Sequence, residues 1–180
     1  DLAGYNLIEV ENPYPASMNI LLGWCLEAGV KLLDKSMAPY QNWTAEYIPT
    51  HIERITNYAG HAAYAGAFVG PDEPAAKAFP ELDAVNDAYA SAFPTKGRTI
   101  NLFPSYANAC QLNCGNGGHI DAGGHNVVSN YEAYVKYFAQ NISANSMMYD
   151  HYCLSKSDKN GDAKRGNVKS TQYYDLDLFR

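Results

Sequence analysis

Two adjacent carboxylates, Asp72 and Glu73, directly follow a short apolar segment in this sequence of 180 residues. Residues Ala65–Gly70 (AGAFVG) have the composition of a buried strand, and prolines stand on both sides of the acidic pair. If this strand belongs to a parallel sheet, both carboxylates lie at its carboxyl end, where the ligands of α/β folds bind. The alternative is the acidic first turn of a helix, because Asp and Glu favour helix N-termini. At the edge of a sheet, a carboxyl group is suited to general acid–base chemistry.

Short apolar segments alternate with helical segments along the chain, which is the order expected of parallel strands joined by crossover helices. Five segments are expected to be strands: Tyr5–Glu9, Val30–Asp34, Ala65–Gly70, Thr99–Phe103 and Ser146–His151. Helices are expected at Ser17–Ala28, His51–Tyr58, Ala75–Phe93 and Tyr131–Asn141. The strands begin 25 to 47 residues apart, near the roughly 31-residue unit of a (β/α)8 barrel. We therefore predict an α/β fold of the (β/α)8 TIM-barrel type, present as an incomplete barrel of about five βα units.

The whole chain, 1–180, is expected to be a single partial (β/α) barrel domain with two irregular segments. Segment 108–126 is predicted to be a Gly/Cys-rich loop insertion, and segment 155–169 a polar loop. His119 and His125 are potential metal ligands in the first of these, but their spacing fixes no third ligand, so a surface loop is favoured. The sequence also contains no P-loop and no dinucleotide-binding fingerprint. Neither a metal nor a cofactor is therefore expected.

The composition is compatible with a carbohydrate as the binding partner, although by itself it favours tyrosines that serve in packing. Thirteen Lys and Arg stand against nineteen Asp and Glu, for a net charge of −6, which argues against nucleic-acid binding and against a polybasic membrane-surface protein. The chain contains fifteen Tyr, and a phenol offers sugars a flat apolar face with a polar tip. The alternative is that these tyrosines serve mainly in packing. No apolar run is long enough for a transmembrane helix.

Three segments resemble motifs of bacterial (β/α)8-barrel glycoside hydrolases, in the broad retaining clan that includes β-galactosidase-like enzymes. They are Gly70–Pro74 (GPDEP), Ile100–Ala107 (INLFPSYA) and Met148–Tyr152 (MYDHY). In that clan the fourth strand ends in Asn-Glu-Pro, and its Glu is the general acid/base. The resemblance implies that Glu73 is the acid/base and that Asp72, at the position of the Asn, is its hydrogen-bonding neighbour.

The resemblance also implies a sugar subsite built from the ends of the neighbouring strands. Its predicted substrate-binding residues are Glu9, Asp34, Asn101, Tyr106, His151 and Tyr152. Trp43, in a loop on the same side of the predicted barrel, is a further candidate for stacking on a sugar ring. A glycosidase needs a second carboxylate besides its acid/base. Asp150 is the strand-end candidate for that role.

The resemblance is partial, because the nucleophile of that clan is a Glu at the end of the seventh strand. If the strand before Asp72 is the fourth, the predicted strands are the second to the sixth, and the first, seventh and eighth are missing. An open parallel sheet exposes two edges that proteins normally cover. We therefore expect another chain or a missing segment to complete the barrel.

Taken together, these features predict a glycosidase that acts on an oligo- or polysaccharide, with Glu73 as general acid/base. Two alternatives stay open: a non-catalytic glycan-binding module, and a structural assembly subunit derived from such a barrel. The expected location is extracellular or at a bacterial cell surface, although no signal peptide is recognised at Asp1–Gly4.

Overall fold

The computed structural model describes residues 4, 6–11, 15–35, 45–115, 127–149, 154–155 and 167–168. Five strands form one sheet in the order β1-β2-β3-β4-β5, and every neighbouring pair is parallel. The strands are β1 Leu7–Val10, β2 Lys31–Asp34, β3 Tyr64–Phe68, β4 Gly97–Leu102 and β5 Ser146–Tyr149. The strand order therefore follows the chain order, as in a barrel that is built unit by unit.

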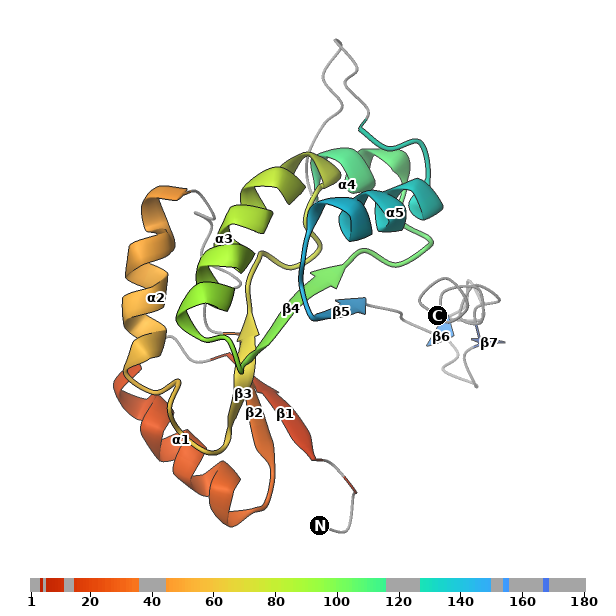
Figure 1. The fold of residues 1–180 in the computed structure, drawn as a ribbon. Helices are drawn as coiled ribbons and strands as arrows, with labels where there is room; N and C mark the ends of the chain where they lie inside the picture. The colour runs from red at the N-terminus through yellow and green to blue at the C-terminus, as the bar shows by residue number, and fades with distance from the viewer. Residues whose placement is uncertain are drawn as a thin grey trace.

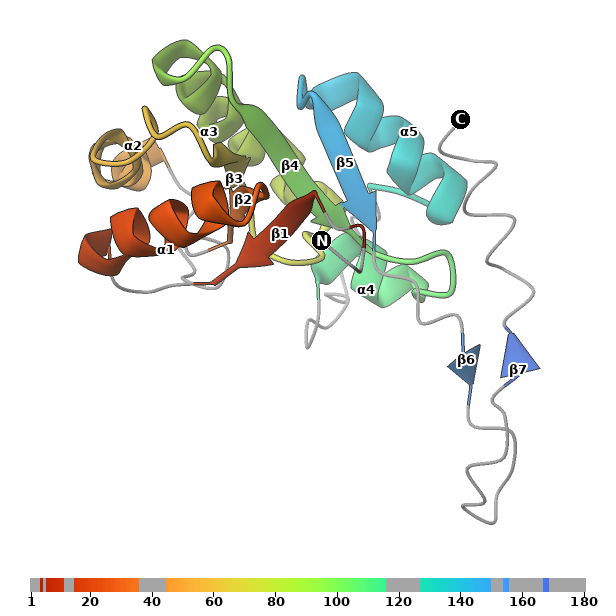
Figure 2. The same ribbon diagram turned by 90° about the horizontal axis from the view of Figure 1, so that it is seen from below.

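Helices connect the strands and cover one face of the sheet (Figures 1 and 2). They are α1 Pro15–Glu27, α2 Ile48–Thr56, α3 Phe79–Ala92, α4 Ala109–Cys114 and α5 Tyr131–Asn141, with the 3-10 turns η1 Ala45–Tyr47 and η2 Ala76–Ala78. The sheet is curled, so the chain forms a parallel five-stranded half-barrel with alternating helices. This is an incomplete α/β barrel, and it confirms the predicted fold class. Among the described helices, none has the length and apolar character that a membrane span requires.

The main hydrophobic core lies between the sheet and its helices. Leu32, Ile100 and Leu102 contribute to it from the strands, and Phe79 and Tyr134 contribute from α3 and α5; all five are fully buried. Leu33 and Phe68 are also buried but form a separate contact. Because successive side chains of a strand point to opposite faces, this second pair lies on the concave face, opposite the helices.

The structure differs from the prediction in the two segments that were expected to be irregular. Helix α4 occupies Ala109–Cys114 at the start of segment 108–126. Asn108 caps this helix: its side chain accepts from the backbone of Gln111, whose own side chain accepts from the backbone of Asn108. At the described ends of segment 155–169, β6 (Leu154–Ser155) pairs antiparallel with β7 (Asn167–Val168).

The close approach of β3 and β4 requires glycine at position 66. A Cβ atom on Gly66 would lie 2.1 Å from the backbone oxygen of Gly97, a contact that only movement of the backbone can relieve. We expect Gly66→Ala to lower the free energy of unfolding by about 1–3 kcal/mol, measured by urea denaturation. Gly23→Ala is the matched control, because its Cβ would meet nothing within 4 Å in α1 and alanine favours helix. Equal stability of the two variants would contradict this spacing of β3 and β4.

Candidate functional site

Asp72 and Glu73 lie just beyond the carboxyl end of β3, before the first turn of η2. The backbone N–H of Glu73 donates to the carbonyl of Asn101 at 3.0 Å, which ties this turn to the neighbouring strand β4. Glu73 is the one non-glycine residue with a positive φ, 50°, among the described residues. This left-handed backbone conformation is unfavourable for residues with a side chain, and such strain is concentrated at functional sites.

A pocket of about 290 Å³ opens beside these two carboxylates. Its lining is Asp72, Glu73, Phe103, Pro104, Tyr106, Ala107 and Gln111. All of these residues come from the segments that follow β3 and β4, at the carboxyl-end rim of the half-barrel. The pocket combines two carboxylates, an amide and two aromatic rings, and therefore offers both polar and flat apolar surfaces to a ligand.

A chain of charged and polar side chains runs across the rim from β1 to β4. Lys35, which directly follows β2, lies 3.2 Å from Glu9 Oε1 and 3.5 Å from Asp72 Oδ2. Asn101 Nδ2 donates to the other oxygen of Asp72 at 2.6 Å. Lys35 also lies over the ring of Phe68, 5.4 Å from its centroid. Asp72 therefore accepts from two donors that come from the neighbouring strands, Lys35 and Asn101.

The pKa of Lys35 lies above its usual value because of this environment. Partial burial acts to lower the pKa, but the hydrogen bond to Glu9 and the charges of Asp72 and Glu9 raise it more. Lys35 is therefore protonated at neutral pH and balances one of its two carboxylate neighbours. With Glu73 included, three carboxylates and one ammonium give the group a formal charge of −2.

Asn101 carries an acceptor that no described residue satisfies. Its side chain is 3% exposed, and while Nδ2 donates to Asp72, the buried Oδ1 has no partner among the described groups. Buried polar atoms normally have a hydrogen-bond partner. This oxygen therefore needs a donor, such as a water molecule or a group outside the described part of the chain.

Asp34 does not join this group, contrary to the prediction. Its side chain is fully buried and accepts a 2.6 Å hydrogen bond from Tyr58 OH. The cause is the alternation along β2, in which Leu32 and Asp34 face the helices whereas Leu33 and Lys35 face the concave side. Burial and the carboxylate of Asp34 raise the pKa of Tyr58. The pair is therefore buried in the core, on the helix side of the sheet.

The remaining predicted residues are divided between the pocket and the part of the chain outside the described residues. Tyr106 lines the pocket and is 40% exposed. Glu9 reaches the group through Lys35. Four predicted residues lie outside the described residues: Trp43, Asp150, His151 and Tyr152. Groups of three or more potential metal ligands are not found among the residues that the structure describes.

The sequence prediction did not include Lys35, Phe103 or Gln111. Lys35 follows Asp34 directly, so the alternation of a strand was a usable signal: if Asp34 faces inward, Lys35 faces the opposite side. Phe103 lies in an expected strand and in the segment Ile100–Ala107, but an apolar residue at a strand end does not by itself indicate a function. Gln111 lay in a segment that was expected to be irregular, so no helix was available to position it.

Two solved structures have folds similar to that of this chain. A sugar phosphate isomerase/epimerase from Parabacteroides distasonis matches 83% of this chain and 58% of its own, at a TM-score of 0.52 and 10% identity. A glycoside hydrolase family 5 structure from Bacteroides vulgatus matches 92% of this chain and 47% of its own, at a TM-score of 0.50 and 11% identity. Both are barrels of the TIM type. No protein-family model and no curated protein matches the sequence.

These similarities define the class of fold, an α/β barrel of the TIM type, of which the described residues form a five-stranded parallel sheet. The chain spans 58% and 47% of the lengths of the two structures. At identities of 10% and 11% a shared fold does not by itself indicate a shared reaction, because TIM barrels support many chemistries. The function must therefore be argued from the site.

Proposed function

We propose that the chain is the core of a glycoside hydrolase that acts on neutral oligo- or polysaccharides, with Glu73 as general acid/base. The observation that carries this proposal is the position of Glu73, which lines a pocket at the carboxyl-end rim of β3 and β4. In barrels of this type the catalytic residues come from that rim. The glycoside hydrolase family 5 structure with a similar fold supports the same class of substrate.

The charge of the site favours a neutral sugar over a sugar phosphate. Glu9 and Asp72 carry two formal negative charges against the one positive charge of Lys35, which contacts both, and Glu73 adds no positive charge in either protonation state. A phosphate group would meet net repulsion in this field. Sugar hydroxyls, in contrast, can donate to the carboxylates that line the pocket.

In this proposal Glu73 donates its proton to the glycosidic oxygen as the bond from that oxygen to the sugar carbon breaks. A water molecule then supplies the hydroxyl group of the new sugar end, and its second proton returns Glu73 to the acid form. The carboxylate of Asp72, to which Lys35 and Asn101 both donate, stabilises positive charge that develops on the sugar. We propose Asp150 as the second catalytic carboxylate.

A non-catalytic glycan-binding module is the second candidate. The contacts of Asp72 favour this candidate. Lys35 and Asn101 both donate to the carboxylate of Asp72, which makes it poorly suited to act as a nucleophile beside Glu73. The experiment that separates the two candidates is a hydrolysis screen on chromogenic glycosides, comparing the parent with Glu73→Gln. Turnover that the substitution abolishes supports the hydrolase, whereas binding without turnover supports the module.

We further propose that another chain or a further polypeptide segment completes the barrel. Large apolar side chains are exposed at both edges of the half-barrel: Leu7 and Ile8 on β1, Ile20 and Trp24 on α1, and Met147 and Met148 on β5. Trp24 is 62% exposed and lines a groove of about 370 Å³ with Val10 of the edge strand. Parallel sheets are normally covered on both faces and protected at their edges.

The intact mass of the protein from its native source tests this completion. We expect either a mass well above that of the 180 residues or, if the mass equals it, self-association in sedimentation equilibrium. A concentration-independent monomer of this chain alone would contradict the proposal. An extracellular site of action is part of the proposed function, because polysaccharides are too large to be taken up intact.

A further inference from the structure

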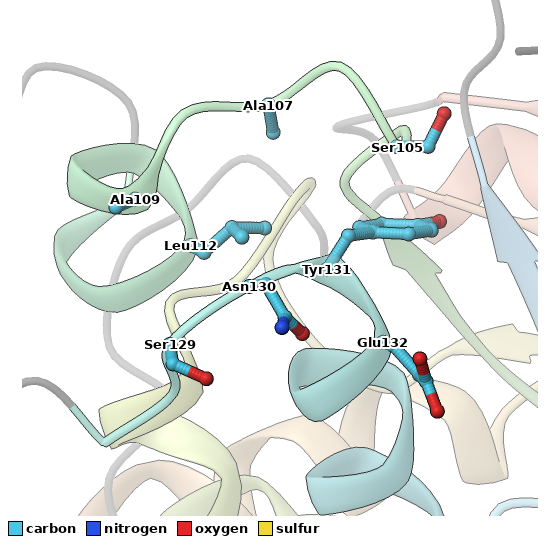
Figure 3. A pocket seen from close by; sticks show the side chains of 8 residues that line it. All are labelled: Ser105, Ala107, Ala109, Leu112, Ser129, Asn130, Tyr131 and Glu132. Atoms are coloured by element: carbon cyan, nitrogen blue, oxygen red, sulfur yellow. The ribbon is translucent and has the colours of Figure 1, made fainter.

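A second cavity of about 440 Å³ lies next to the Glu73 pocket, between the connection from β4 to α4 and the start of α5 (Figure 3). The residues of its wall that matter here are Ser105, Ala107, Ala109, Leu112 and Glu132. Helix α4 follows the carboxyl end of β4, and α5 leads back to the start of β5. Both walls of the cavity therefore belong to the same rim of the half-barrel as Glu73.

The segment after β4 forms a wall shared by the two cavities. Pro104 and Tyr106 line the Glu73 pocket, Ser105 lines the second cavity, and Ala107 borders both. These residues form a turn in which Ala107 N donates to the carbonyl of Pro104 at 2.9 Å, and their side chains project to both sides of it. The two cavities are therefore neighbours on either side of a single short stretch of chain, and a ligand with several similar units could occupy both.

The second cavity has the chemistry of a site for a neutral polar ring. The hydroxyl of Ser129, which lines the cavity and belongs to an exposed residue, can donate to or accept from such a ring. Ala109 and Leu112 supply apolar surface. The carboxylate of Glu132 is paired with Lys136 at 2.5 Å, so it adds no unbalanced charge.

We propose that this cavity is a subsite for a further sugar residue of a neutral oligosaccharide whose bond is cleaved at Glu73. This inference rests on the proposed function and extends it, because it predicts that the protein prefers chains of several sugars over short glycosides. The volumes of about 440 Å³ and 290 Å³ are each comparable with small-molecule sites, which range from about 300 to 1,000 Å³.

Ala109→Phe tests the subsite, because Ala109 lines the second cavity but not the Glu73 pocket and is exposed at the first position of α4. The larger side chain is expected to fill the cavity. Ser129→Phe, which fills it from the side of α5, is a second variant in case the first disturbs α4. Ala92→Phe is the matched control, an exposed alanine at the end of α3, far from the rim.

The probes are β-1,4-linked di- and tetrasaccharides of glucose, mannose, xylose and galactose. For the sugar series that is hydrolysed, we expect kcat/KM of the parent to be about tenfold higher for the tetrasaccharide, the effect of roughly one or two added hydrogen bonds. Ala109→Phe should remove that advantage and leave the disaccharide within about twofold of the parent. An equal effect on both lengths, or none on either, would overturn the subsite.

Binding of the same sugars to Glu73→Gln, measured by calorimetry, separates the two proposals. A chain-length preference that Ala109→Phe removes, combined with full hydrolysis by Glu73→Gln, would leave the subsite standing and refute the acid/base role. Loss of hydrolysis in Glu73→Gln without a chain-length preference would refute the subsite alone. Absence of both binding and hydrolysis for every probe would refute both.

Discussion

Glu73→Gln is expected to lower kcat for glycoside hydrolysis by about 10²–10⁴-fold, the usual contribution of a general acid or base. Glutamine keeps the shape of the side chain but cannot supply the proton that the leaving oxygen needs. The backbone position is set by the hydrogen bond from Glu73 N to Asn101 O, which does not depend on the side chain. The loss should therefore appear in kcat, with stability nearly unchanged. The measurement is steady-state kinetics on the best substrate of the chromogenic screen.

Glu81→Gln is the matched control for this change. Glu81 lies in the first turn of α3, is exposed and lines neither of the two cavities. We expect its kcat to equal that of the parent within about twofold, because the residue is outside the site. Surface substitutions of this kind also change stability by no more than roughly 0.5 kcal/mol. Equal activity of Glu73→Gln and Glu81→Gln would show that Glu73 does not take part in the reaction.

Phe79→Ala is expected to lower the free energy of unfolding by about 3–5 kcal/mol, the range for truncating a buried aromatic side chain. Phe79 is fully buried and contacts three rings of α5: Tyr134, Tyr137 and Phe138, at centroid distances of 5.2, 5.7 and 5.4 Å. Tyr134 in turn donates to the carbonyl of Pro74 at 2.7 Å. The space left by the missing ring therefore weakens the packing of α3 on α5. It also weakens the support of the turn that carries Glu73.

Trp24→Ala is the control for Phe79→Ala, and urea denaturation measures the free energy of unfolding of both variants. Trp24 is also a large aromatic residue of a helix, but it is 62% exposed. Its truncation should change the stability of the chain by about 0.5 kcal/mol or less. Similar losses for the two variants would show that the aromatic cluster around Phe79 is not the packing centre described here.

The sheet could be predicted from the sequence because each strand is a short apolar run between turn-forming residues. Residues Tyr64–Phe68 and Gly97–Leu102 form the strands expected at 65–70 and 99–103, shifted by one or two residues. The regular alternation with helices predicted parallel pairing, and parallel pairing placed Asp72 and Glu73 at one rim. These predictions depend on periodicity, which a single sequence contains.

The polar contacts of the site could not be predicted in the same way. Whether Asp34 or Lys35 faces the concave side depends on the register of one strand, and a shift of one residue reverses every side chain. The sequence prediction chose Asp34, but packing of Leu32 against the helices turns Asp34 into the core. The pairing of Lys35 with Glu9 and Asp72 follows from that register, and strand composition alone does not determine it.

Helix α4 was not predicted because its sequence, ACQLNC, is short and lies in a segment with many glycines. The signal that could have found it is the pair Asn108 and Gln111, which has the three-residue spacing of a capping box. Without α4, the second cavity could not be anticipated, since Ala109 and Leu112 form one of its walls.

The most direct test of the acid/base role of Glu73 is the dependence of hydrolysis on the leaving group. A general acid matters most for a poor leaving group and least for one that departs without a proton. For Glu73→Gln we predict a loss of at least about 10²-fold in kcat/KM on an alkyl or sugar glycoside, but of less than roughly tenfold on the 2,4-dinitrophenyl glycoside of the same sugar. An equal loss on both substrates, or no loss on either, would contradict the assignment of Glu73.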